Sequence, residues 1–63
     1  MIAVYYVEVE HPGQFPYILG LEGSASPWLS RTPDGAQRKR DELAAAHPDA
    51  DVRVVEGQAD IAP

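Results

Sequence analysis

The fold is decided by residues 2–10, which read Ile2-Ala3-Val4-Tyr5-Tyr6-Val7-Glu8-Val9-Glu10. β-branched and aromatic residues dominate this stretch, and both types favour the pleated backbone of a strand. Side chains alternate across a strand, so the two faces can be read separately. One face is wholly apolar or aromatic and consists of Ala3, Tyr5, Val7 and Val9. The other face is apolar only at its start and consists of Ile2, Val4, Tyr6, Glu8 and Glu10.

The residues that follow predict a hairpin. Residues 11–14 read His-Pro-Gly-Gln, in which proline presets φ at the first corner and glycine accepts the positive φ of a type II turn. Residues 15–22 supply the returning strand, and Pro16 places its start at an edge or a bulge because proline donates no ladder hydrogen bond. The expected face toward the core holds Phe15, Tyr17, Leu19 and Leu21. Residues 28–31 form either a short extra strand or a loop folded back on the core.

A helix is predicted over residues 33–46. Thr32 can cap its free amide groups, and Pro33 fits the first helical position, where no N–H is needed. Pro48 disfavours helical geometry at the residue before it, so the helix should end near residue 46. Its apolar stripe is thin, because Leu43 is the only large apolar residue among small alanines.

Residues 52–56 read as a last strand closed by Gly57, and residues 58–63 as a flexible tail. A right-handed crossover through the helix places this strand beside the first and gives the sheet order 2-1-3. We therefore expect one α+β domain over residues 1–57. It has an antiparallel-rich sheet of three or four strands, in the order β-β-(β)-α-β, with one helix on one face.

Composition limits the classes of function. The chain has 63 residues, no cysteine and a net charge of −5, so its core is small and neither disulfides nor thiolate metal sites support it. The negative charge repels nucleic acid and anionic membranes. The first residues lack a basic signal-peptide region and no apolar run is long enough to span a bilayer, so a cytoplasmic protein is expected. The residue usage, with no asparagine and one lysine, suggests a GC-rich genome.

The second face of the sheet is the feature that points to a function. One helix covers only one face, and an apolar patch of about a few hundred Å² on the other is typical of an interaction site. A loop or the tail could cover this patch, a second copy could bind it in a homodimer, or a different protein could. The leading hypothesis is an acidic protein-binding module, such as a regulator or inhibitor of a larger protein, encoded by a phage or mobile element. The predicted contact residues are Ile2, Val4, Tyr6, Glu8, Glu10 and Ile18.

A nucleic-acid-binding accessory protein is the alternative. Basic residues combined with an aromatic residue are typical of nucleic-acid contact. The candidate residues are Trp28, Arg31, Arg38, Lys39 and Arg40. Consecutive helical residues point about 100° apart, however, so residues 38–40 cannot form one flat basic face, and the acidic residues 41 and 42 follow directly. Nucleic acid is therefore the disfavoured partner.

No catalytic site is predicted. Glu8 and Glu10 share a strand face near His11, but an acid–base pair needs a cleft that a solvated strand end does not offer. His11 and His47 would need a third ligand to form a metal site, and the sequence does not identify one. The serines lack the setting of a nucleophile. We therefore expect neither enzymatic activity nor a cofactor nor a metal.

Overall fold

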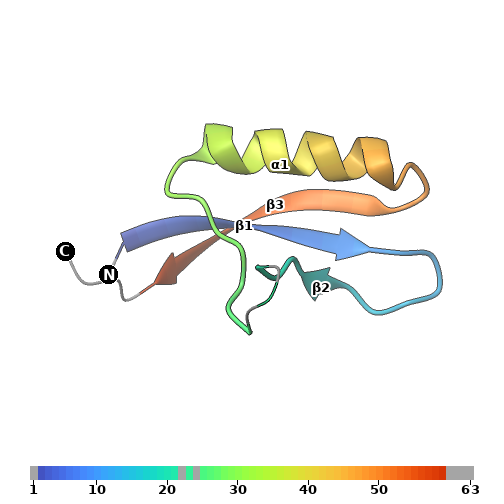
Figure 1. Cartoon of the computed structure of the whole chain (residues 1–63), viewed down its shortest axis with the longest axis horizontal. Helices are drawn as coiled ribbons and strands as arrows, with labels where there is room; N and C mark the ends of the chain where they lie inside the picture. The colour runs from blue at the N-terminus through green and yellow to red at the C-terminus, as the bar shows by residue number, and fades with distance from the viewer. Residues whose placement is uncertain (1, 22, 24, 60–63) are drawn as a thin grey trace.

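The computed structural model describes residues 2–21, 23 and 25–59 of the 63-residue chain. Its elements follow in the order β1 (Ile2–Glu10), β2 (Tyr17–Ile18), α1 (Pro33–Ala46) and β3 (Asp51–Ala59). The strands form an antiparallel sheet of order β2-β1-β3, and α1 lies along one face of it (Figure 1). The predicted α+β class, the central position of the first strand and the single helix on the sheet are confirmed.

β1 and β3 form a long twisted ribbon. Their pairing is continuous from Ile2 opposite Ala59 to Glu10 opposite Asp51, and the two strands cross in Figure 1 because the ribbon is strongly twisted. β1 is therefore hydrogen-bonded along its whole length on this side. The other elements are arranged around this central strand.

Gly57 does not end the last strand, contrary to the prediction. It lies opposite Val4 within the ribbon, and a Cβ atom placed on it would come within 2.7 Å of Cε2 of Tyr6. The glycine thus leaves room for the Tyr6 ring to lie across the strand, which is a known use of glycine in a sheet. β3 continues to Ala59, so two residues of the predicted tail belong to the sheet. The remainder of that tail, residues 60–63, lies outside the described residues.

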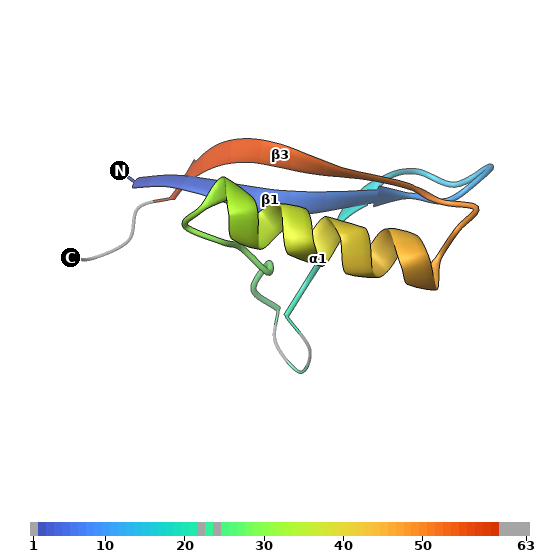
Figure 2. The ribbon, with the colours of Figure 1, turned by 90° about the horizontal axis from the view of Figure 1, so that it is seen from above.

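β2 is much shorter than predicted, since only Tyr17 and Ile18 form a strand. The Leu19 N–H still donates to the Val7 carbonyl at 2.8 Å, after which residues 19–21 pair with residues 26–28. We call these two paired segments the arm. The N–H groups of Trp28 and Leu21 donate across it to Leu19 and Ser26, each at 2.9 Å. Figure 2 shows the chain in this region projecting away from the ribbon.

The chain returns from the arm to β1 before the helix begins. Ser30 exchanges two backbone hydrogen bonds with Tyr5, at 2.8 and 2.9 Å, in an isolated bridge. The question left open for residues 28–31 is thereby answered for the described residues, because this segment makes one bridge to the sheet and no extra strand.

α1 begins and ends where the sequence predicts. Oγ1 of Thr32 accepts a hydrogen bond from the Gly35 N–H at 3.2 Å, and Pro33 occupies the first turn. At the other end the His47 N–H donates to the Leu43 carbonyl at 2.8 Å. The helix has 14 residues. Among the described residues no helix has both the length and the apolar character needed to cross a membrane.

The core lies between α1 and the ribbon. Val7, Val9 and Val52 form its central cluster, and Ala36 of α1 is also buried. The partly buried residues packed against this cluster are Leu19, Trp28, Leu43, Ala44 and Ala50. The helix therefore covers the face of β1 that carries Val7 and Val9, which the sequence alone did not decide. Ala3, at the start of the same face, stays exposed.

Candidate functional site

The predicted contact face lies on the side of the sheet away from α1. By strand alternation β1 places its even-numbered residues there, and Ile18 lies opposite Glu8 on the same face. Val4, however, is fully buried, and Tyr6 and Ile2 are partly buried. Val4 therefore offers a partner no surface, which corrects that part of the prediction. The Tyr6 ring lies against Gly57, the residue that pairs with Val4.

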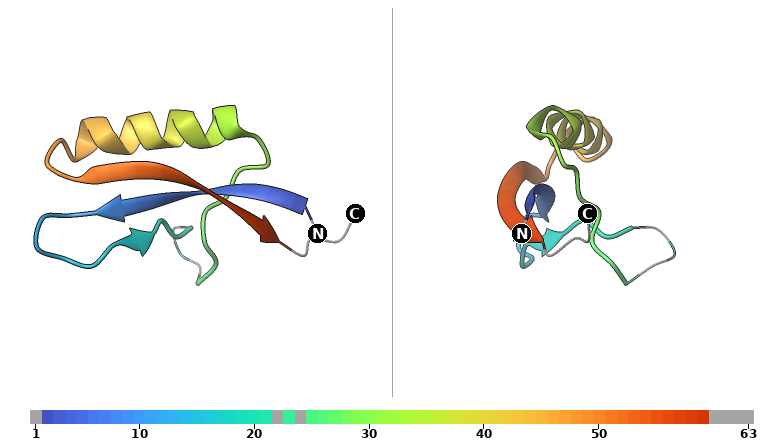
Figure 3. Two further views of the ribbon diagram at one scale, coloured as in Figure 1. Left: turned by 180° about the vertical axis from the view of Figure 1, so that it is seen from behind. Right: turned by 90° about the vertical axis from the view of Figure 1, so that its left-hand side faces the viewer.

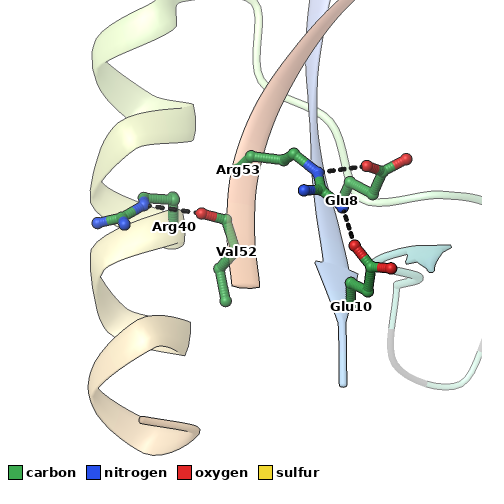
Figure 4. A network of polar contacts seen from close by, with 5 residues as sticks. All are labelled: Glu8, Glu10, Arg40, Val52 and Arg53. Atoms are coloured by element: carbon green, nitrogen blue, oxygen red, sulfur yellow. Dashed lines mark hydrogen bonds and ion pairs between the residues drawn. The ribbon is translucent and has the colours of Figure 1, made fainter. Parts of the chain in front are cut away.

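The acidic end of this face is occupied by an arginine. Arg53 lies directly opposite Glu8 in the ribbon, and its Nε donates to Glu8 at 2.5 Å while its Nη2 donates to Glu10 at 2.7 Å (Figure 4). The hydrogen bonds that Arg53 donates to Glu10 and, as the next largest cause, to Glu8 raise the pKa of its guanidinium. One fork of donors thus pairs with both carboxylates, although its single positive charge offsets only one of their two negative charges. They do not form a free acid–base pair.

The basic cluster does not form one surface. Trp28 packs against the core, and Arg40 donates from Nε to the Val52 carbonyl at 3.0 Å (Figure 4). Nη1 of Arg40 also bonds Asp41 at 2.9 Å, and this bond, together with one from Gln37, lowers the pKa of Asp41. Lys39 lies 3.6 Å from Glu42.

Two members of the basic cluster, Arg31 and Arg38, remain exposed. The fold thus uses the rest of the cluster for packing and for contacts within the chain. Nucleic-acid contact through this cluster stays a prediction that the geometry does not strengthen.

The exposed large apolar residues gather instead in one segment. Phe15 is 95% exposed, Tyr17 48%, Ile18 40% and Leu21 46%. We call these four residues the apolar edge, because they lie on and beside β2, one of the two outer strands of the sheet. Three of them, Phe15, Tyr17 and Leu21, were expected to face the core.

The apolar edge is exposed because the helix does not reach it. α1 packs on β1 and β3 and makes no contact with β2, and the end-on view in Figure 3 shows the helix above the ribbon with the chain after β2 to one side. Pro16 cannot extend the ladder, so β2 stays too short to bring Phe15 over the core. A shallow groove lined by Leu19, Gly20, Leu21, Trp28, Lys39 and Leu43 separates the arm from α1.

A second group of side chains meets at the end of the sheet. The rings of His11 and His47 lie edge to face with centroids 5.4 Å apart. Tyr17 stacks on His11 at 6.0 Å, and its hydroxyl lies 3.3 Å from Nε2 of His11. An open hollow beside this group is lined by Glu10, His11, Pro12, Gly13, Asp49 and Asp51.

Sequence reasoning weighed the two histidines together but did not identify Tyr17. The signal was the hairpin register, which pairs Tyr17 with Val9 and so returns its ring toward His11. Within the described part of the chain, no three His, Cys, Asp or Glu side chains are grouped so that they could hold a metal ion.

Comparisons with protein family models, with curated proteins and with solved structures found no match. A function for the chain must therefore be inferred from its own geometry.

Proposed function

We propose that the protein is a small acidic binding module that contacts another protein through the apolar edge. The observation that carries this proposal is that Phe15, Tyr17, Ile18 and Leu21, all at least 40% exposed, follow one another along a single outer strand and the start of the arm. The contact surface proposed here is shifted from the sheet face toward its edge. Ile18 belongs to both surfaces.

Exposed apolar side chains at a sheet edge favour binding for two reasons. Removing such side chains from water contributes about 25 cal/mol for each Å² of apolar area. An outer strand also presents backbone groups that can pair with a strand of a partner. β2 is one of the two outer strands, and Pro16 just before it has no N–H to donate, so pairing at this edge would centre on residues 17 and 18.

Net charge favours a different protein over a second copy. The chain carries −5, and two copies repel each other at long range, whereas a basic or neutral partner is not repelled. A module of this kind suits a regulatory or inhibitory role toward a larger protein, because affinity can come from a few aromatic and apolar anchors without catalytic groups.

The test selects proteins that bind the chain and then maps the residues that they contact. Binders selected from a displayed library of protein fragments are titrated against the wild-type chain, a Phe15→Ser/Ile18→Ser variant and an Arg38→Ser control on the exposed helix surface. We expect the double variant to weaken binding at least about tenfold while the control does not. Amide chemical shifts should change at residues 15–21. Binders that map to α1 or to the Tyr6 face, with unchanged affinity for the double variant, would contradict the proposal.

A further inference from the structure

We propose that His11, Tyr17 and His47 form a binding site for a divalent transition-metal cation of the Zn²⁺ and Cu²⁺ class. The three residues come from different elements, since His11 follows β1, Tyr17 lies in β2 and His47 is the C-cap of α1. The fold alone brings them together. The inference does not rest on the proposed protein-binding function, with which it shares only Tyr17.

The distances from His11 to Tyr17 and from His11 to His47 are compatible with one bound ion. Zinc bonds nitrogen and oxygen donors at about 2.0–2.2 Å, so two donors at corners of a tetrahedron lie about 3.3–3.5 Å apart. Nε2 of His11 and Oη of Tyr17 are 3.3 Å apart. Two imidazoles on one tetrahedral ion have ring centroids about 5 Å apart, and those of His11 and His47 are 5.4 Å apart.

The donor chemistry selects the class of metal. Imidazole nitrogen suits Zn²⁺, Cu²⁺ and Ni²⁺, whereas Mg²⁺ and Ca²⁺ prefer sets of oxygen ligands. Three protein ligands leave a further position for water, which is the pattern of an open zinc site. His47 is exposed and Tyr17 is about half exposed, so an ion can reach the site from solvent.

Negative charge beside the site favours a cation. Glu10, Asp49 and Asp51 line the hollow that His11 also borders. These carboxylates do not group with the histidines as ligands, so their role is to lower the electrostatic energy of an approaching cation. The net charge of −5 acts in the same direction.

Binding has a defined proton balance. Each histidine coordinates the metal through a ring nitrogen that carries no proton, and the Tyr17 phenol releases its proton to solvent when its oxygen coordinates the cation. The bound ion supports this loss in the same way that it acidifies bound water.

The ion would connect the ends of β1, β2 and α1. A ligand that binds only the folded state stabilises it by mass action, by an amount that grows with its concentration over Kd. Small domains often supplement a small core with a metal. This chain has no cysteine and therefore no disulfide.

The experiment titrates the full chain, first stripped with EDTA, with ZnCl₂, CuCl₂ and MgCl₂ near neutral pH. Calorimetry should give one ion per chain for Zn²⁺ or Cu²⁺, with a rise in Tm that EDTA reverses, and no effect of Mg²⁺. His11→Ala and His47→Ala should each weaken binding at least about tenfold. Tyr17→Phe should weaken it by a smaller factor and remove one released proton, whereas Tyr6→Phe, the matched control, should change neither.

Chemical shifts of the wild-type chain, measured by NMR with and without Zn²⁺, locate the site without any variant. Shifts induced by Zn²⁺ should be centred on His11, Tyr17 and His47. Absence of binding by Zn²⁺ and Cu²⁺, or shifts confined to the acidic hollow, would overturn the proposal. Binding that is unchanged in folded His47→Ala and Tyr17→Phe variants would overturn it as well.

Discussion

Apolar side chains are buried in the β1–β3 ribbon and exposed in the segment around β2. In the ribbon nine residues of each strand pair without interruption and α1 buries Val7, Val9 and Val52. Around β2 the strand has two residues and the large apolar side chains stay in solvent, with Phe15 95% exposed. Both regions contain several apolar residues. They differ in whether the single helix reaches them.

This difference separates the residues that stabilise the fold from those that are proposed to bind a partner. The ribbon and helix supply what stability the chain has, and the segment around β2 is free to present apolar groups to a partner because the core does not depend on them. Substitutions in the two regions should therefore have separable effects, on folding in one case and on binding in the other.

The largest expected effect is the contrast between a core valine and the apolar edge. Val7→Ala should lower the free energy of unfolding by about 2–3 kcal/mol, since it leaves a cavity in a packed site. Phe15→Ala should change it by less than about 0.5 kcal/mol, because the Phe15 side chain is already in water. Urea unfolding followed by circular dichroism measures both. If both variants lost the same free energy of unfolding, the contrast between a buried ribbon and an exposed apolar edge would be contradicted.

Within the sheet, Gly57→Ala should cost about 1–2 kcal/mol. The new methyl group would lie 2.7 Å from Cε2 of Tyr6, so the ring must move from its place over the strand. Gly20→Ala in the arm is the matched control, since its methyl group would meet only the Ser26 carbonyl at 3.8 Å. The same urea titration should show almost no change for the control. A neutral Gly57→Ala would mean that Tyr6 does not pack as described.

Loss of the helix cap should have an intermediate effect. Thr32→Ala removes the acceptor of the Gly35 N–H and should cost about 1 kcal/mol, whereas Thr32→Ser keeps the hydroxyl and most of the stability. Thermal unfolding of the two variants measures the difference. If Thr32→Ala matched the wild type, the cap would contribute nothing and the helix would depend on packing alone.

The smallest effect concerns the pH dependence of Asp41. Arg40 and Gln37 lower its pKa from the ordinary value of 3.8. A carboxyl group with a lower pKa in the folded state stabilises the fold above its unfolded pKa, and this contribution is lost as the pH falls through the folded value. The stability difference between wild type and Asp41→Asn should therefore shrink below pH 3.8. A difference that stayed constant on acidification would contradict the bonds drawn to Asp41.

Signals that are local in sequence gave correct predictions. The helix bounds follow from Thr32, Pro33 and Pro48, which act within one turn of their own positions, and the observed helix is Pro33–Ala46. The first strand follows from the β-branched and aromatic residues among residues 2–10, and the observed strand is Ile2–Glu10. These features depend on neighbouring residues and need no knowledge of the remaining chain.

Signals that depend on distant contacts were missed. The alternation of residues 15–21 predicts a core face correctly only if the helix extends over β2, and it does not. Gly57 was read as a strand end because the glycine gives no sign that the Tyr6 ring needs the space beside it. The meeting of His11, Tyr17 and His47 requires both the hairpin register and the position of the helix end.

The most direct test of the open apolar edge uses the absence of cysteine from the chain. Single variants Phe15→Cys and Val7→Cys are labelled with a thiol reagent in native buffer at several protein concentrations. The account predicts that the Phe15→Cys thiol reacts as fast as in the unfolded chain at every concentration. The Val7→Cys thiol should react at least about a hundredfold more slowly, because it reacts only after opening of the core. Protection of the Phe15→Cys thiol even at the lowest concentration would contradict the account.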